Sequence, residues 1–121
     1  MVNRVLIAED DEDTRIVYKT IIKTSFGSDI IIDEVEDGKE EIEFAKRNKY
    51  NVIISDGNMK RLDGLVAAEI LRGLGITTPI VMVSGLIGIE EEAKKRGVTE
   101  FYSKPIKSAN LYPILKKYLY K

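Results

Sequence analysis

Short apolar runs alternate with amphipathic segments from one end of the chain to the other. Five runs stand out: Val5–Ala8, Ile30–Ile32, Val52–Ile54, Ile80–Val83 and Phe101–Tyr102. They are rich in β-branched residues, and the middle runs are apolar at every position. This pattern is typical of strands that are buried on both faces, as in a parallel sheet.

The segments between these runs carry apolar residues at helical spacing. In the first segment, Ile16, Val17 and Ile21 share one face, with Tyr18 or Ile22 at its margin. The later segments are marked by Ile42 and Ala45, by Leu65, Ala68 and Leu71, by Ile89 and Ala93, and by the apolar positions of residues 111–119. We therefore expect a helix after each strand.

Strand and helix alternating five times predict an α/β fold with a parallel sheet. We expect one domain over residues 1–121, a flavodoxin-like, doubly wound (βα)5 fold with strand order 2-1-3-4-5. Pro113 is expected near the start of the last helix, where its missing N–H costs little. No linker, repeat or low-complexity segment interrupts this pattern.

The amino-acid composition argues against several classes of function and points to none directly. The 19 basic and 20 acidic residues nearly balance, so no basic excess points to direct nucleic-acid binding. The chain has no Cys and no His, which excludes thiolate chemistry, His general bases and a phosphohistidine carrier. No apolar run approaches the roughly 18 residues of a membrane span, and no signal peptide is visible. A cytoplasmic location without membrane contact is the default expectation.

Acidic residues follow the first predicted strand without a break, from Glu9 to Asp13. In open α/β sheets, ligands bind beyond the carboxyl ends of the strands. Asp10 and Asp11 follow the first strand and Asp56 follows the third, which neighbours the first in the expected order. Three crowded carboxylates do not all stay ionised without a cation. Oxygen ligands with room for water suit Mg²⁺, so we predict a magnesium site here.

The fourth and fifth strands end in Ser84 and Lys104. A lysine ammonium is a point-charge partner for phosphate, and a serine hydroxyl donates to a phosphoryl oxygen. Metal, ammonium, hydroxyl and carboxylate together make a phosphoryl-transfer site. Asp56 is the candidate nucleophile, because Asp10 and Asp11 are free to share the metal and carboxylates do accept phosphoryl groups.

The motifs at these strand ends resemble those of receiver domains of two-component response regulators, over the whole chain. The matching stretches are EDD, SDGNM, LDG, VSG and KP. The resemblance implies that Asp56 receives a phosphoryl group from a sensor histidine kinase or phosphotransfer protein. It also implies that Asp11 and Asp56 bind Mg²⁺ through side chains, Asn58 through its backbone carbonyl, and Asp10 mainly through water.

The same resemblance implies a signalling switch that catalyses only its own phosphorylation and dephosphorylation. Ser84 and Lys104 would contact the phosphoryl group, the Lys104–Pro105 peptide would be cis, and Phe101 would change rotamer on activation. The fourth helix, fifth strand and fifth helix would then present a changed surface to a downstream protein or to a second copy of the chain. Lys60 departs from the family pattern, which usually has proline there.

Other interpretations compete with this one. Taken singly, the acidic run fits charges favoured at a helix N-terminus, with Glu9, Glu12 and Asp13 as surface charges. The acidic residues that follow the second strand, Asp33, Glu34 and Glu36, fit a solvated loop. A phosphatase of the haloacid-dehalogenase type would begin its site with D-x-D, as at residues 11–13, but Arg15 does not fit. A degenerate receiver that only binds partners stays the main alternative.

Overall fold

Five strands and five helices alternate along residues 2–119, the part of the chain that the computed structural model describes. The strands are β1 (Arg4–Ala8), β2 (Ile31–Val35), β3 (Val52–Ser55), β4 (Ile80–Ser84) and β5 (Glu100–Ser103). The helices are α1 (Glu12–Phe26), α2 (Gly38–Arg47), α3 (Gly64–Gly73), α4 (Glu90–Lys95) and α5 (Ser108–Lys116). The predicted βα alternation is confirmed.

All strands pair in parallel, in the order β2-β1-β3-β4-β5. β1 and β3 are central neighbours, and Ala8 lies opposite Ser55 at their carboxyl ends. The backbone N–H of Asp56 then donates to the carbonyl oxygen of Ala8 at 3.0 Å. The residues that follow β1 and β3 therefore emerge side by side at one edge of the sheet, as the predicted order requires.

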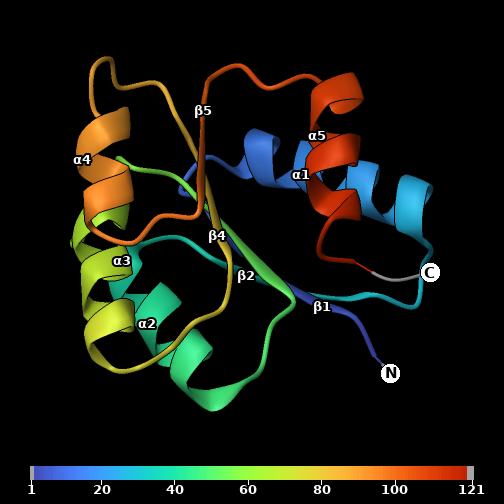
Figure 1. Ribbon diagram of the computed structural model, residues 1–121. Helices are drawn as coiled ribbons and strands as arrows, with labels where there is room; N and C mark the ends of the chain where they lie inside the picture. Colours follow the sequence, from blue (N-terminus) through green and yellow to red (C-terminus); the bar gives the residue numbers. More distant parts are fainter. Residues whose placement is uncertain (1, 120–121) are drawn as a thin grey trace.

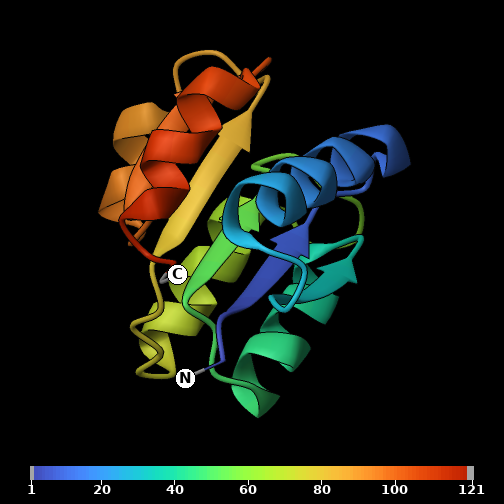
Figure 2. The ribbon, with the colours of Figure 1, turned by 90° about the vertical axis from the view of Figure 1, so that its right-hand side faces the viewer.

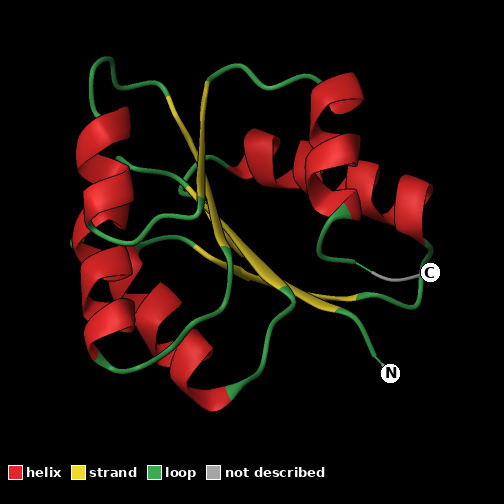
Figure 3. Cartoon of the chain, viewed as in Figure 1, coloured by secondary structure: helices red, strands yellow, loops and turns green. Residues whose placement is uncertain are grey.

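The helices cover both faces of the sheet (Figure 1; Figure 3 colours the same view by secondary structure). α1 and α5 lie on one face, and α2, α3 and α4 lie on the other, an arrangement also visible in the turned view of Figure 2. Successive strand residues alternate between the two cores: Val5 and Ile7 pack with α1 and α5, whereas Leu6 and Ala8 pack on the opposite side. Burial on both faces explains why β1, β3 and β4 are apolar between their end residues.

The buried face of α1 differs from the expected one. Tyr18, Ile22 and Phe26, spaced four residues apart, face the core, whereas Ile16 and Val17 are 47% and 49% exposed. Both sets have helical spacing, so periodicity alone does not choose between them. The direction of the helix over the sheet makes the choice, and it leaves two aliphatic side chains in solvent.

The second and fifth strand–helix units also need correction. β2 extends to Val35, so Asp33 and Glu34 lie within an edge strand and not in a solvated loop. Asp33 pairs with Arg4, and Glu34 pairs with residues of α1. α5 begins at Ser108, one exposed turn earlier than its apolar pattern indicates, which places Pro113 inside the helix. No helix within residues 2–119 has the length and apolar character needed to cross a bilayer.

Candidate functional site

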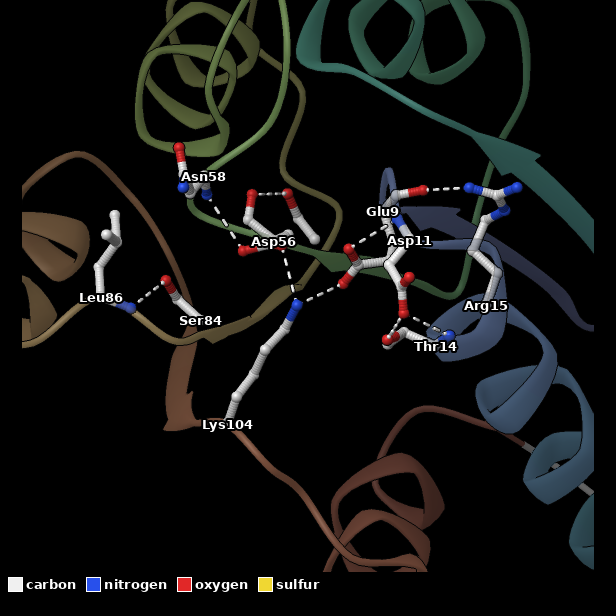
Figure 4. Close-up of polar contacts among 10 residues, drawn as sticks. Glu9, Asp11, Thr14, Arg15, Asp56, Asn58, Ser84, Leu86 and Lys104 are labelled. Atoms are coloured by element: carbon white, nitrogen blue, oxygen red, sulfur yellow. Dashed lines mark hydrogen bonds and ion pairs between the residues drawn. The ribbon is translucent and has the colours of Figure 1, made fainter.

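Side chains from the ends of four strands meet at the carboxyl edge of the sheet (Figure 4). Glu9 follows β1, Asp56 follows β3, Ser84 ends β4 and Lys104 follows β5. Glu9, Asp56 and Ser84 are buried, and Lys104 is partly buried. A parallel sheet produces this convergence directly, because all its strands end on the same side.

Lys104 links two buried carboxylates. Its Nζ lies 2.8 Å from Oε1 of Glu9 and 3.0 Å from Oδ2 of Asp56. Figure 4 shows the lysine side chain reaching between them. Burial opposes the ammonium charge, but the hydrogen bonds to Glu9 and Asp56 outweigh it and raise the pKa of Lys104. The lysine therefore stays charged and holds Asp56 in place.

Glu9 was expected to be a surface charge, and that prediction is wrong. Its side chain is buried, its Oε2 accepts from the backbone N–H of Asp11, and its Oε1 accepts from Lys104. Burial raises the pKa of Glu9 to about 7, the hydrogen bond from Lys104 opposes the rise, and the charge of Asp56 adds to it. A single ammonium therefore does not neutralise the negative charge gathered at this edge.

An oxygen-rich cluster lies beside the lysine. Glu9, Asp10 and Asp56 each offer a carboxylate oxygen, and these three oxygens lie within 4.8 Å of one another. Hard divalent cations such as Mg²⁺ prefer oxygen ligands of this kind, and two or three carboxylates with room for water fit Mg²⁺ well. In the loop between β3 and α3, the backbone N–H of Asn58 donates to Oδ1 of Asp56 at 3.1 Å.

Asp11 lies outside this cluster. It is the N-cap of α1, where its Oδ2 accepts hydrogen bonds from the backbone N–H and the hydroxyl of Thr14. Those bonds lower the pKa of the Asp11 carboxyl. Capping satisfies an otherwise orphaned backbone donor at the helix start, which explains the direction of the side chain. The structure thus brings Asp10 and Asp56 together as expected, adds Glu9 and leaves Asp11 apart.

Ser84 lies on the other side of Asp56. Its hydroxyl oxygen is buried and accepts from the backbone N–H of Leu86 at 3.1 Å. A Cβ on Gly57 would lie 3.0 Å from the Ser84 Oγ, so a larger residue there would press against the Ser84 hydroxyl. Ser84 is therefore held next to the loop that carries Asp56, with its hydroxyl proton free to donate toward that loop.

The loop between β3 and α3 is fastened at several points. The guanidinium of Arg61, a residue with a positive φ of 61°, pairs with the buried carboxylate of Asp37 at 2.5 Å. The side chain of Asp37 also caps α2. A Cβ on Gly64 would clash with the carbonyl oxygen of Asp56, so the start of α3 packs directly against the site. Lys60, which stands where a proline was expected, forms a backbone bridge to Asp37.

Two further expectations concern β5 and the segment after it. The Lys104–Pro105 peptide is cis, as expected. Phe101 is partly buried and borders a pocket of about 560 Å³ that is also lined by Leu86, Ile87 and residues of α4. The aromatic ring therefore lies between the interior and the surface of the domain.

Comparison with known proteins agrees with this geometry. The family model of the response regulator receiver domain matches residues 5–116. A two-component response regulator from Oryza sativa, ORR41, is 35% identical over 119 residues, which are 95% of this chain and 93% of that protein. A protein-glutamate methylesterase/protein-glutamine glutaminase from Archaeoglobus fulgidus is 36% identical over 84% of this chain, but the match spans only 30% of that protein.

Solved structures show the same fold. The receiver domain of the sensor histidine kinase PA1611 from Pseudomonas aeruginosa, with a magnesium ion coordinated in its active-site cleft, superposes with a TM-score of 0.84 at 25% identity, covering 98% of each chain. The chemotaxis response regulator CheY4 of Vibrio cholerae, at 24% identity, gives a TM-score of 0.84 and covers 98% of this chain and 100% of its own. The chain belongs to the response regulator receiver domain family, and its acidic pocket fits the magnesium and phosphoaspartate chemistry of two-component signalling.

Proposed function

We propose that residues 1–121 form one receiver domain that accepts a phosphoryl group on Asp56 from a sensor histidine kinase or phosphotransfer protein. The supporting observation is the environment of Asp56: a buried carboxylate, 3.0 Å from the Lys104 ammonium and within 4.8 Å of two further carboxylates. Few structural roles need so much charge in one place, and a phosphoryl-transfer site does.

Mg²⁺ would be held by Asp10 and Asp56, with Glu9 beside them and the Asn58 carbonyl as the expected backbone ligand. When bound, it would neutralise charge on the transferring phosphoryl oxygens. An oxygen of Asp56 attacks the phosphorus; the new O–P bond forms as the N–P bond to the donor imidazole breaks, and the electron pair leaves with that nitrogen. Lys104 then shifts from the carboxylates toward a phosphoryl oxygen, and the Ser84 hydroxyl donates to another.

The phosphodonor protein must reach Asp56 from the open edge of the sheet. A pocket of about 260 Å³ lies beside Lys104 and is lined mostly by apolar groups of Val17, Tyr18, Pro105 and Ile106. Val17 is half exposed and continues this pocket along α1. Apolar surface next to a catalytic lysine suits a protein donor, so we assign the docking of the kinase or phosphotransfer protein to this face.

The output surface is assigned to α4, β5 and α5. α4 has six residues, no side-chain cap at its N-terminus and one buried residue, Ala93. An element with so few buried contacts is moved at low cost. Movement of Ser84 toward the phosphoryl group would leave space that Phe101 fills, which would change the surface offered to a downstream protein or to a second copy of the chain.

Labelling the chain with phosphoramidate and Mg²⁺ tests the acceptor assignment. Intact mass spectrometry should show one added phosphoryl group, labile to hydroxylamine and dependent on Mg²⁺. Asp56→Asn should take no label, whereas Asp29→Asn, the same change at an exposed carboxylate, should label normally. An unlabelled wild type would favour the degenerate receiver that only binds partners, although Asp56 and Lys104 are both present and in contact.

A further inference from the structure

A carboxyl group lies buried beneath the Asp56 loop without a charged partner. Glu41, on α2, is fully buried. Its Oε2 is the one buried side-chain polar atom within residues 2–119 that has no hydrogen-bond partner. No ion pair involving Glu41 is formed within these residues, and its hydrogen-bond partner is the neutral hydroxyl of Ser55. An ionised carboxylate in such a place would carry a large uncompensated desolvation cost.

The other oxygen of Glu41 begins a short chain of contacts that ends at Asp56. Oε1 of Glu41 lies 3.1 Å from Oγ of Ser55, which is also buried. The same Oγ lies 3.3 Å from the backbone carbonyl oxygen of Asp56. A serine hydroxyl has one proton, so Ser55 donates to only one of these two oxygens at a time.

Counting protons decides the direction of this chain. If Glu41 were a carboxylate, Ser55 would have to donate to it, and the buried carbonyl of Asp56 would lose the Ser55 donor. If Glu41 is a neutral acid, its own proton goes to Ser55 Oγ, and the Ser55 proton goes to the Asp56 carbonyl. Only the neutral acid satisfies both contacts, and it leaves Oε2 as an uncharged carbonyl oxygen.

We infer that Glu41 is a positioning residue, carried as a neutral acid that acts through Ser55 to hold the backbone carbonyl of Asp56. The inference rests on Asp56 being the phosphoryl acceptor. Independently of the contact geometry, burial raises the pKa of Glu41 to about 8, and the hydrogen bond with Ser55 opposes the rise. The neutral form therefore predominates at neutral pH.

The position of this relay explains why it bears on the reaction. The backbone N–H of Asp56 is fixed by Ala8 at 3.0 Å, and the relay fixes its carbonyl on the other side. With both peptide groups held, the Asp56 side chain keeps its direction toward Lys104. Small losses of positioning at a reacting group reduce rates markedly, because the reactive geometry is sampled less often.

Three variants separate positioning from simple packing. Glu41→Gln keeps the size, the neutrality and a donor toward Ser55. Glu41→Met keeps the size and neutrality but has no donor, so Ser55 keeps its proton and loses the contact that fixes its rotamer. Ser55→Ala removes the middle of the relay. The rate of labelling by phosphoramidate with Mg²⁺ should stay within about twofold for Glu41→Gln and fall about three- to tenfold for the other two, as expected for one hydrogen bond. Combining Glu41→Met with Ser55→Ala should cost no more than either alone, because both break one unit.

Melting temperatures measured alongside exclude loss of folding as the cause, since Glu41→Met should be at least as stable as wild type. The inference is overturned if Glu41→Gln labels as slowly as Glu41→Met, or if Glu41→Met and Ser55→Ala label at the wild-type rate. A labelling rate that is near wild type in Glu41→Gln and reduced in Glu41→Met is the outcome that a packing role alone does not produce.

The protonation state is tested without any phosphorylation. Infrared difference spectra between wild type and Glu41→Gln at neutral pH should show loss of one protonated-carboxyl C=O band. Absence of that band overturns the inference even if Asp56 is labelled. If wild type shows the band but takes no label, the proposed function fails while the charge state of Glu41 stands, and the positioning role falls with the function.

Discussion

The acidic cluster at the carboxyl edge of the sheet leads to a prediction in which Asp10 and Asp11 respond differently to the same substitution. Asp10 contributes to the cluster with Asp56, whereas Asp11 caps α1. We expect Asp10→Asn to stabilise the metal-free protein and to abolish its stabilisation by Mg²⁺. Asp11→Asn should do neither, because asparagine caps a helix about as well as aspartate.

The size of the first effect follows from the spacing of the carboxylates. Two unit charges 4.8 Å apart repel by roughly 3.5 kcal/mol at an effective dielectric of about 20. Asp10 is partly exposed, so solvent screens its share, and Lys104 offsets part of the remainder. A net gain of about 1–2 kcal/mol is expected on neutralising Asp10, which is a rise in Tm of roughly 3–10 °C for a domain of this size.

Thermal unfolding with and without millimolar Mg²⁺ measures both effects on the same samples. Wild type and Asp11→Asn should gain stability with Mg²⁺ by mass action, and Asp10→Asn should not. If Asp11→Asn loses the Mg²⁺ response and Asp10→Asn keeps it, the side-chain directions described above do not govern metal binding. Equal responses in all three proteins would remove the cluster from consideration as a metal site.

Three further predictions concern stability, docking and output. Because the pKa of Glu41 is raised from 4.5 to about 8 in the folded protein, folding takes up a proton between these values, so the contribution of Glu41 to stability is fully present below pH 4.5 and is lost as pH rises to 8. At pH 7 this contribution has fallen by about 3 kcal/mol, from 2.5 pH units at about 1.36 kcal/mol each. The difference in unfolding free energy between wild type and Glu41→Gln, measured by urea titration at several pH values, should follow this curve, and a pH-independent difference would contradict it. Val17→Asp should slow phosphorylation by a kinase at least about tenfold but leave phosphoramidate labelling unchanged. The control Leu74→Asp, at an exposed apolar position at the end of α3, should alter neither rate. If Val17→Asp slows both reactions, the substitution damages the phosphorylation site and does not report on docking. Phe101→Ala should label normally, while backbone amide shifts induced by beryllofluoride across α4, β5 and α5 should shrink relative to wild type; an unchanged response would exclude this ring as the route of transmission.

Much of the site was accessible from the sequence because a parallel sheet has simple geometry. Apolar runs mark the strands, βα alternation makes them parallel, and parallel strands deliver Asp56, Ser84 and Lys104 to one edge. These three residues stand alone at their strand ends, so an error of one residue in a strand boundary does not change the assignment. Local pattern and fold class therefore suffice for them.

Only the tertiary structure distinguishes residues that look equivalent in the local sequence pattern. Glu9, Asp10 and Asp11 are chemically alike and consecutive, and only the place where β1 ends and α1 begins turns two of them toward Asp56 and the third toward Thr14. Glu41 follows another glutamate on a charged helix, and although its spacing from Ala45 places it on the inner face, nothing in the sequence shows that its carboxyl is fully buried. Its environment comes from β3, 14 residues away at Ser55, because the contacts that bury a helical residue belong to the elements packed against it and not to its own segment.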